Sequence, residues 1–123
     1  MNLSKNVFLN CFSSSNIELI KQSDIISIPS QEYESFGYVA VEAMSEKKLV
    51  IATKCGGLKE IIKNNHNGYL ANVEDPNDFA KKIFFVINNI KEISITKKNA
   101  YNTFRKKFCY DKMNENYKKL IEK

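Results

Sequence analysis

Short apolar runs alternate with amphipathic stretches through the first half of the chain. The runs 24–29 and 50–53 are rich in isoleucine, valine and alanine, which is typical of buried strands, and Pro29 closes the first of them. The stretches 16–22 and 37–46 flank these runs and have the apolar spacing of helices. Strands and helices in alternation indicate a parallel sheet with covering helices. The pattern therefore predicts an α/β fold.

The apolar run 7–12 predicts a further strand near the start of the chain. Asp75 and Pro76 form a strong helix start, because an acidic cap and a proline in the opening turn both suit the amino end of a helix. The other elements predicted in the second half are a strand at 69–71 and helices at about 58–64, 78–89, 96–107 and 110–122. A chain of this length suits one domain.

The composition is that of a globular protein. Of the 123 residues, 43% are hydrophobic and 27% are charged, which is typical of a globular domain. The three cysteines are odd in number and far apart, which suits neither a disulfide framework nor a metal site and favours a reducing, cytoplasmic setting. No run reaches the roughly 20 apolar residues that a membrane span needs.

The net charge of +5 raises the question of an anionic partner, since clustered lysines bind the backbone of nucleic acids. Most of the basic residues are scattered, and the densest group, at 97–107, is interleaved with Tyr101 and Phe104 at helical spacing. This pattern favours a solvated helix face. We expect no nucleic-acid partner, and the alternative for the basic group is weak contact with a membrane surface or with phosphate.

The segment 29–44 combines an apolar helix with residues suited to ligand chemistry. It leaves the carboxyl end of a predicted buried strand, which is where open parallel sheets bind their ligands. Backbone amides at the helix start, near Phe36 and Gly37, would point unpaired donors at that crevice, and the helix dipole would add partial positive charge. Gly37 would let a ligand approach the backbone closely. A pyrophosphate fits such a site.

Two glutamates lie in the same segment. Glu42 is the one charged residue in an otherwise apolar turn of helix, so its carboxylate must reach water or accept strong hydrogen bonds. The vicinal hydroxyls of a sugar supply such bonds. Glu34 lies eight residues earlier, in the loop at the helix mouth, where it would meet a second part of the same ligand. The alternative is that Glu34 is an ordinary loop carboxylate and Glu42 lies on a solvent-exposed edge.

The order of residues around these glutamates resembles the signature of the glycosyl transferases group 1, a large family of retaining glycosyltransferases. The matching positions are Glu34, Glu42, Ala43-Met44, Gly56-Gly57, Glu60, the segments 67–70, 75–80 and 108–111, and Tyr117. The similarity covers nearly the whole chain. It implies the GT-B architecture of two Rossmann-like lobes and assigns residues 1–123 to the carboxyl-terminal, nucleotide-sugar-binding lobe. The chain would then be an amino-terminally truncated domain with a partial Rossmann-like parallel sheet and flanking helices.

The resemblance also implies roles for individual residues. Glu34 would be the catalytic residue at the hydroxyls of the transferred sugar, and Glu42 would bind the ribose hydroxyls of the nucleotide. Phe36 and Gly37 would bind substrate through backbone contacts to the sugar and the diphosphate. The expected donor is a UDP-, GDP- or ADP-sugar, with no other cofactor and no essential metal. Amides and basic side chains would then stabilise the leaving diphosphate.

The sequence departs from the family pattern at several positions. The arginine and lysine that bind phosphate in the family come from a part of the lobe that precedes the residues of this chain. Asn10 stands where a glycine usually closes a strand, and Lys47 and Leu49 replace a glycine and a proline. Lys47 is therefore expected to adopt a left-handed conformation, at a cost of about 1 kcal/mol.

Two functions follow from the resemblance and its gaps. The first is the donor lobe of a hexosyltransferase acting on a glycan, a lipid or a small acceptor, with a separately encoded amino-terminal lobe as partner. The second is a non-catalytic truncated remnant or nucleotide-sugar-binding module. Gly56-Gly57 is either a turn near the phosphates or a plain strand-to-helix turn. His66, in an asparagine-rich turn, is predicted at the surface.

Overall fold

The computed structural model describes residues 5–9 and 15–122. Its strands β1 (Ile25–Ile28), β2 (Leu49–Thr53) and β3 (Tyr69–Ala71) form a parallel sheet in the spatial order β1-β2-β3. The helices of this part of the chain are α1 (Asn16–Gln22), α2 (Tyr38–Ser45), α3 (Leu58–Ile61), α4 (Pro76–Asn88), α5 (Ile90–Lys107) and α6 (Tyr110–Ile121). The predicted parallel sheet with flanking helices is confirmed.

Strand β2 is the centre of both the sheet and the core. It pairs with β1 on one side and with β3 on the other, and all five of its residues are buried. Because side chains alternate between the two faces of a strand, Val50 and Ala52 join one hydrophobic cluster, and Leu49 and Ile51 join another. The uniformly apolar run in the sequence reflects this burial on both faces.

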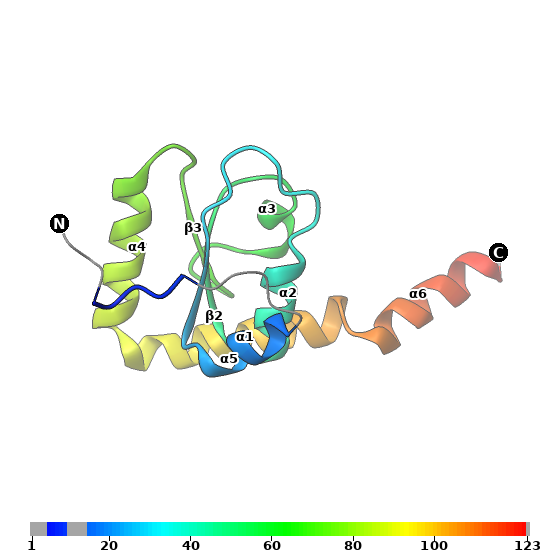
Figure 1. Ribbon diagram of the computed structural model, residues 1–123. Helices are drawn as coiled ribbons and strands as arrows, with labels where there is room; N and C mark the ends of the chain where they lie inside the picture. The colour runs from blue at the N-terminus through cyan, green and yellow to red at the C-terminus, as the bar shows by residue number, and fades with distance from the viewer. Residues whose placement is uncertain (1–4, 10–14, 123) are drawn as a thin grey trace.

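The helices cover the two faces of the sheet unequally (Figure 1). Helices α2 and α3 pack on one face and α4 packs on the other. Helix α5 crosses beneath the strands and serves both faces, since Ile93 belongs to the α4 cluster and Ala100 to the α2 cluster. A single helix thus ties the two layers together.

Helix α5 begins at Ile90, which corrects the predicted start near Thr96. Helices α4 and α5 are separated by Asn89 alone, which is the carboxyl-terminal cap of one and the amino-terminal cap of the other. Isoleucines are weak helix formers, but Ile93 is only 7% exposed and packs with Val86. Burial of this turn outweighs its low helix propensity, so the last two helices span 90–121 and not 96–122.

Helix α3 ends at Ile61, earlier than the predicted end at residue 64. The side chain of Asn67 takes over the hydrogen bonds that further helical turns would make. Its Oδ1 accepts from the Lys63 amide at 2.7 Å, and its Nδ2 donates to the Ile61 carbonyl at 3.2 Å. His66 is exposed, as predicted.

Lys47 adopts the left-handed conformation that the sequence predicts, with φ of 57°. Its amino group lies 4.8 Å from the centroid of the Tyr101 ring, which gives the strained residue a cation–π contact with α5. The predicted strand at 7–12 is wrong for residues 7–9, which form no strand. Residues 10–12, and with them Asn10, lie outside the described residues.

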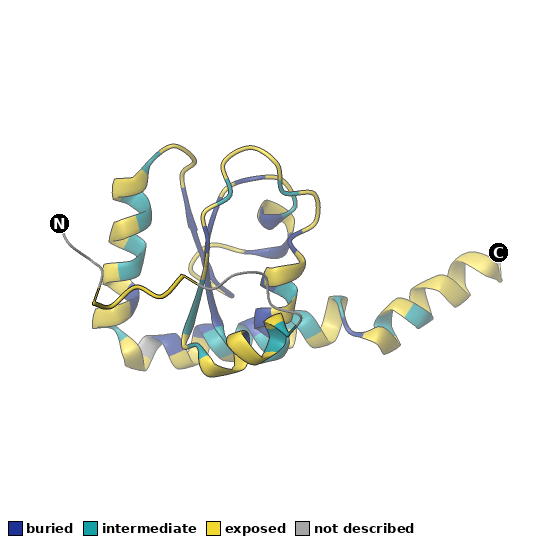
Figure 2. Cartoon of the chain, viewed as in Figure 1, coloured by how far each residue is buried: buried dark blue, intermediate teal, exposed yellow. Residues whose placement is uncertain are grey.

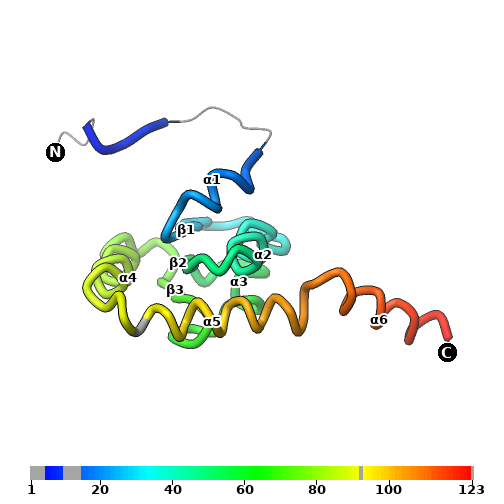
Figure 3. Tube along the Cα trace, turned by 90° about the horizontal axis from the view of Figure 1, so that it is seen from below, coloured from blue at the N-terminus to red at the C-terminus, as the bar shows by residue number. Residues whose placement is uncertain are grey.

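Helix α6 extends away from the sheet (Figures 1 and 3). None of its residues is buried, and Figure 2 shows exposed residues along its length. Lys112 donates a hydrogen bond to Glu115 at 2.8 Å; this bond raises the pKa of Lys112 and lowers the pKa of Glu115. None of the described helices is long and apolar enough to span a membrane.

Candidate functional site

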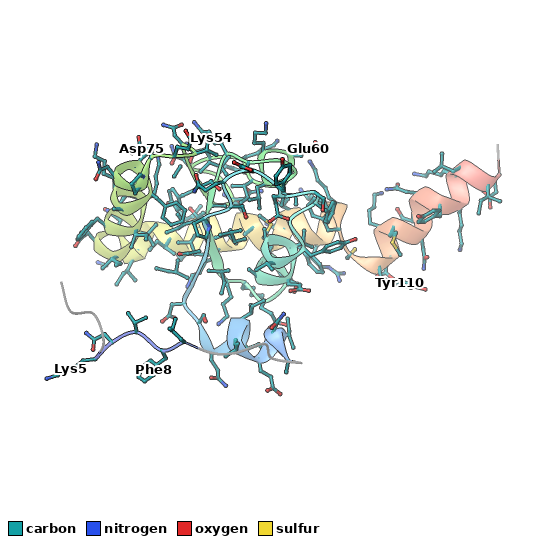
Figure 4. The ribbon with its side chains drawn as sticks, turned by 45° about the horizontal axis from the view of Figure 1, so that its top comes forward. Lys5, Phe8, Lys54, Glu60, Asp75 and Tyr110 are labelled. Atoms are coloured by element: carbon teal, nitrogen blue, oxygen red, sulfur yellow. The ribbon has the colours of Figure 1, made fainter. Side chains whose placement is uncertain are left out.

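The carboxyl ends of the three parallel strands meet at one edge of the sheet. Figure 4 shows Lys54, Glu60 and Asp75 along this edge, with Lys5 and Phe8 on the opposite side of the molecule. The loop after β1 carries the predicted site residues, and the loop after β2 begins the turn into α3. This is the crevice position at which open α/β sheets bind ligands.

The backbone of Glu34 is fixed by the loop after β2. Its carbonyl oxygen accepts a hydrogen bond from the Gly57 amide at 2.9 Å. A Cβ atom added to Gly56 would lie 1.8 Å from that oxygen, and one added to Gly57 would lie 2.5 Å from the carbonyl oxygen of Phe36. The two glycines therefore permit the close packing of the two loops, a role that the sequence alone did not indicate.

The carboxylate of Glu34 is half-buried and has a local partner. The hydroxyl of Ser30 donates to Glu34 Oε2 at 3.3 Å. The carbonyl of Ser30 accepts a short hydrogen bond from the hydroxyl of Thr53, which is only 1% exposed at the end of β2. Sequence reasoning did not connect these residues. The Ser30–Glu34 contact is local but lies in an irregular loop, and the Thr53–Ser30 contact joins the ends of neighbouring strands, which leaves no spacing signal.

Gly37 caps the amino end of α2 in a left-handed conformation, with φ of 94°. A Cβ atom there would lie 3.0 Å from Leu58 Cδ2, so both the dihedral angle and the packing call for glycine. No side chain caps this helix end, and the first turn carries no acidic residue, within the part of the chain described. The positive end of the α2 dipole is therefore not neutralised locally.

Phe36 links this helix start to the end of α5. Its ring lies 4.8 Å from the Tyr38 ring and meets the Phe108 ring edge-on at 6.0 Å, between centroids. Phe36 is 38% exposed, and its own backbone packs against Gly57. The aromatic contacts therefore hold the ring, while the glycine turn supports the backbone.

Glu42 is exposed on α2, whose buried residues are Ala40, Ala43 and Met44. Its carboxylate makes no hydrogen bond or ion pair with any residue of 5–9 or 15–122. The structure therefore places Glu34 and Glu42 in one loop-and-helix unit, with Glu34 anchored and Glu42 facing solvent. The roles of Glu34, Phe36, Gly37 and Glu42 toward a ligand stay predictions.

The described residues include no group of three or more histidine, cysteine, aspartate or glutamate side chains that could hold a metal ion. The expectation that the reaction needs no essential metal stays a prediction.

At the site edge, the amino group of Lys54 lies 3.2 Å from Asn72 Oδ1.

Comparisons with known proteins identify relatives over most of the chain. An uncharacterized glycosyltransferase of Methanocaldococcus jannaschii is 40% identical over 103 residues, which cover 84% of this chain and 29% of that protein. Among solved structures, Staphylococcus aureus TarM has a TM-score of 0.84 and 28% identity, and the match covers 99% of this chain and 24% of TarM. Anabaena HepE in complex with UDP-glucose has a TM-score of 0.79 and 27% identity, with coverage of 85% and 29%.

These relatives agree on the fold and on the family. The chain spans less than a third of the length of each of them. The predicted fold, a Rossmann-like part of a GT-B lobe, is confirmed by the structural matches. The family model described as "Glycosyl transferases group 1" matches residues 1–103 of this chain. This chain therefore belongs to the glycosyl transferases group 1 family.

Proposed function

We propose that this chain is the donor-binding part of a nucleotide-sugar-dependent, retaining glycosyltransferase. The observation that carries the proposal is the anchored Glu34 at the carboxyl edge of the sheet, directly before the uncapped amino end of α2. The complexes of HepE with UDP and with UDP-glucose support a donor of this class. A separate hydrolase or binding function has no comparable support among the described residues.

The geometry suits the two charged and polar ends of such a donor. Within residues 5–9 and 15–122 the backbone amides of Gly37 and Tyr38 donate no hydrogen bond, so they would be free to bind the diphosphate, whose negative charge the helix dipole favours. Glu34 accepts hydrogen bonds from the hydroxyls of the transferred sugar, and Glu42 accepts them from the ribose. Donors that are fixed in advance stabilise the charge that develops on the leaving diphosphate.

In this proposal the phosphate-binding cations belong to an earlier part of the same lobe, and the acceptor site belongs to a further lobe. Because the chain spans less than a third of the length of these three relatives, we place the acceptor site on an amino-terminal lobe carried by a partner chain or by another part of a longer protein. The acceptor is a glycan, a lipid or a small molecule. UDP-, GDP- and ADP-sugars are the candidate donors.

Calorimetry with UDP-glucose and with UDP tests the assignment of the two glutamates. Glu42→Ala should weaken the binding of both ligands roughly tenfold, because a charge-assisted hydrogen bond to the ribose is lost in each complex. Glu34→Ala should weaken UDP-glucose by a similar factor and leave UDP unchanged. Glu60→Ala, an exposed glutamate on α3 at the same edge, is the control and should change neither affinity.

The absence of any binding would contradict the proposal if it persists with UDP-, GDP- and ADP-glucose and with an amino-terminal lobe added. The competing function, a non-catalytic nucleotide-sugar-binding module, is favoured only by the short span of the chain relative to its relatives. Donor binding without transfer or hydrolysis, in the presence of the amino-terminal lobe, would support that module instead.

A further inference from the structure

Ser30 contacts Glu34, Thr53 contacts Ser30, and neither has a part in the function proposed above. We propose that Ser30 is a positioning residue that is held by Thr53 and fixes the carboxylate of Glu34 for the transferred sugar. The pair would thereby set the preference of the site for a sugar-bearing donor over the bare nucleoside diphosphate. The inference rests on the proposed function.

Thr53 lies at the point where backbone pairing between β1 and β2 stops. The last paired residues are Ile28 and Ala52. Pro29 follows Ile28 and has no amide hydrogen with which to extend the ladder. The hydroxyl of Thr53 provides the next link, since it donates to the carbonyl of Ser30 and lies 3.5 Å from the carbonyl of Ile28. Beyond the last backbone pair of β1 and β2, the side chain of Thr53 therefore holds the start of the loop that carries Glu34.

The placement of this hydroxyl is unusual for its strand. The other four residues of β2 are apolar, and Thr53 is as deeply buried as they are. A buried hydroxyl destabilises the fold unless it has a hydrogen-bond partner, and Ser30 supplies that partner. Valine has the same shape as threonine and would fill the space without a donor, so the hydroxyl serves the loop and not the packing of the core.

Ser30, whose carbonyl is held in this way, also contacts the carboxylate of Glu34. Its hydroxyl donates to Glu34 Oε2 at 3.3 Å, while the Gly57 amide holds the carbonyl of Glu34 at 2.9 Å. The side chain of Glu34 is thus restrained within its own loop, and its backbone is restrained by the loop after β2. A carboxylate ordered before the ligand arrives loses less conformational entropy on binding. This smaller loss of entropy strengthens the binding only of a ligand that contacts Glu34. In the proposed function, the part of the ligand that contacts Glu34 is the sugar.

The test compares dissociation constants for UDP-glucose and UDP, measured by calorimetry on the 123-residue chain. Ser30→Ala should weaken UDP-glucose roughly three- to tenfold and leave UDP unchanged. Ser30→Thr keeps the hydroxyl and should retain the wild-type preference. Thr53→Val should act in the same direction as Ser30→Ala, and Thr53→Ser should not.

Two further variants separate positioning from general stability. In a Glu34→Ala background, Ser30→Ala should have no further effect, because Ser30 acts only through that carboxylate. Ser94→Ala is the matched control: its hydroxyl donates to the Lys91 carbonyl at 2.9 Å on α5, and its loss should change neither affinity. Equal weakening of both ligands by Ser30→Ala, or an unchanged preference, would overturn the inference.

A second measurement needs no ligand. NMR order parameters of the Glu34 side chain should fall in Ser30→Ala and Thr53→Val and stay high in Ser30→Thr. Unchanged order in both loss variants would overturn the positioning role. If the wild-type chain binds none of UDP-, GDP- or ADP-glucose, the proposed function fails, and the order parameters still decide whether Ser30 fixes the carboxylate.

Discussion

The carbonyl oxygen of Glu34 and the amide nitrogen of Gly57 lie 2.9 Å apart, although 22 residues lie between them in the chain. This hydrogen bond joins the loop that follows β1 to the loop that follows β2. The close approach depends on the glycine pair, since a Cβ atom on Gly56 would overlap the same carbonyl oxygen. The candidate site and the stability of the fold are therefore coupled at this contact.

Gly56→Ala should destabilise the chain by roughly 2–5 kcal/mol. The added Cβ would lie 1.8 Å from the Glu34 carbonyl oxygen, and the residue has a positive φ of 44°. Urea denaturation followed by circular dichroism measures the free energy of unfolding. The exposed Lys59→Ala on α3 is the control and should stay within about 0.5 kcal/mol of wild type. An equally small effect of Gly56→Ala would show that the loops can separate without cost.

Asn67→Ala should cost roughly 2–4 kcal/mol of unfolding free energy, because its amide serves several groups at a buried site. The side chain is 1% exposed and contacts the Lys63 amide, the Ile61 carbonyl and the Thr103 hydroxyl. Thr103→Val removes one of these partners and should cost about 1 kcal/mol. His66→Ala, at the neighbouring exposed position, should be near neutral by the same measurement. A loss below that of Thr103→Val would contradict the role of Asn67.

Asp75→Ala should lower the free energy of unfolding by about 1 kcal/mol, since Asp75 Oδ1 accepts from the Asp78 amide at 2.9 Å and caps α4. Asp75→Asn keeps an accepting oxygen and should retain most of the stability. Asn77→Ala, exposed in the same first turn, tests whether any change in this turn has the same effect. Thermal denaturation ranks the three variants, and an Asp75→Asn loss as large as that of Asp75→Ala would exclude capping as the cause.

Lys47→Gly should stabilise the chain more strongly when Tyr101 is replaced by leucine than in the wild type. Glycine removes the left-handed strain, worth about 1–2 kcal/mol, but it also removes the cation–π contact, worth about 0.5–1 kcal/mol at an exposed site. In Tyr101→Leu the cation–π contact is already absent, so Lys47→Gly relieves the strain without losing that contact and raises the free energy of unfolding by more. A double-mutant cycle by urea denaturation measures the difference, and equal effects in both backgrounds would show that the ring contact adds no stability.

The hydrophobic pattern by itself determined most of the layer architecture. The run at β2 is apolar on both faces, and the amphipathic stretch at α4 follows a clear Asp75-Pro76 start, so both elements could be located without tertiary information. The left-handed conformation of Lys47 was expected from the resemblance, because Lys47 replaces a glycine of the family pattern after the glutamate helix. These features depend on local spacing and backbone preferences.

Tertiary packing decided the features that local preferences leave open. Helix α5 begins at Ile90 because Ile93 is buried against α4. Helix α3 ends early because the side chain of Asn67 bonds to the Ile61 carbonyl and the Lys63 amide. Neither contact has a fixed spacing in the sequence.

The candidate site shows the same division. Its glutamates and Gly37 were identified from the sequence, since their order around a helix start follows a recognisable pattern. The supports of Glu34, namely Ser30, Thr53 and the glycine turn, emerged only from the structure. Thr53 and the glycine turn follow the neighbouring strand β2, and residues at the ends of parallel strands meet in space whatever their separation along the chain. Ser30 lies in the same loop as Glu34, where the irregular backbone gives no periodic signal.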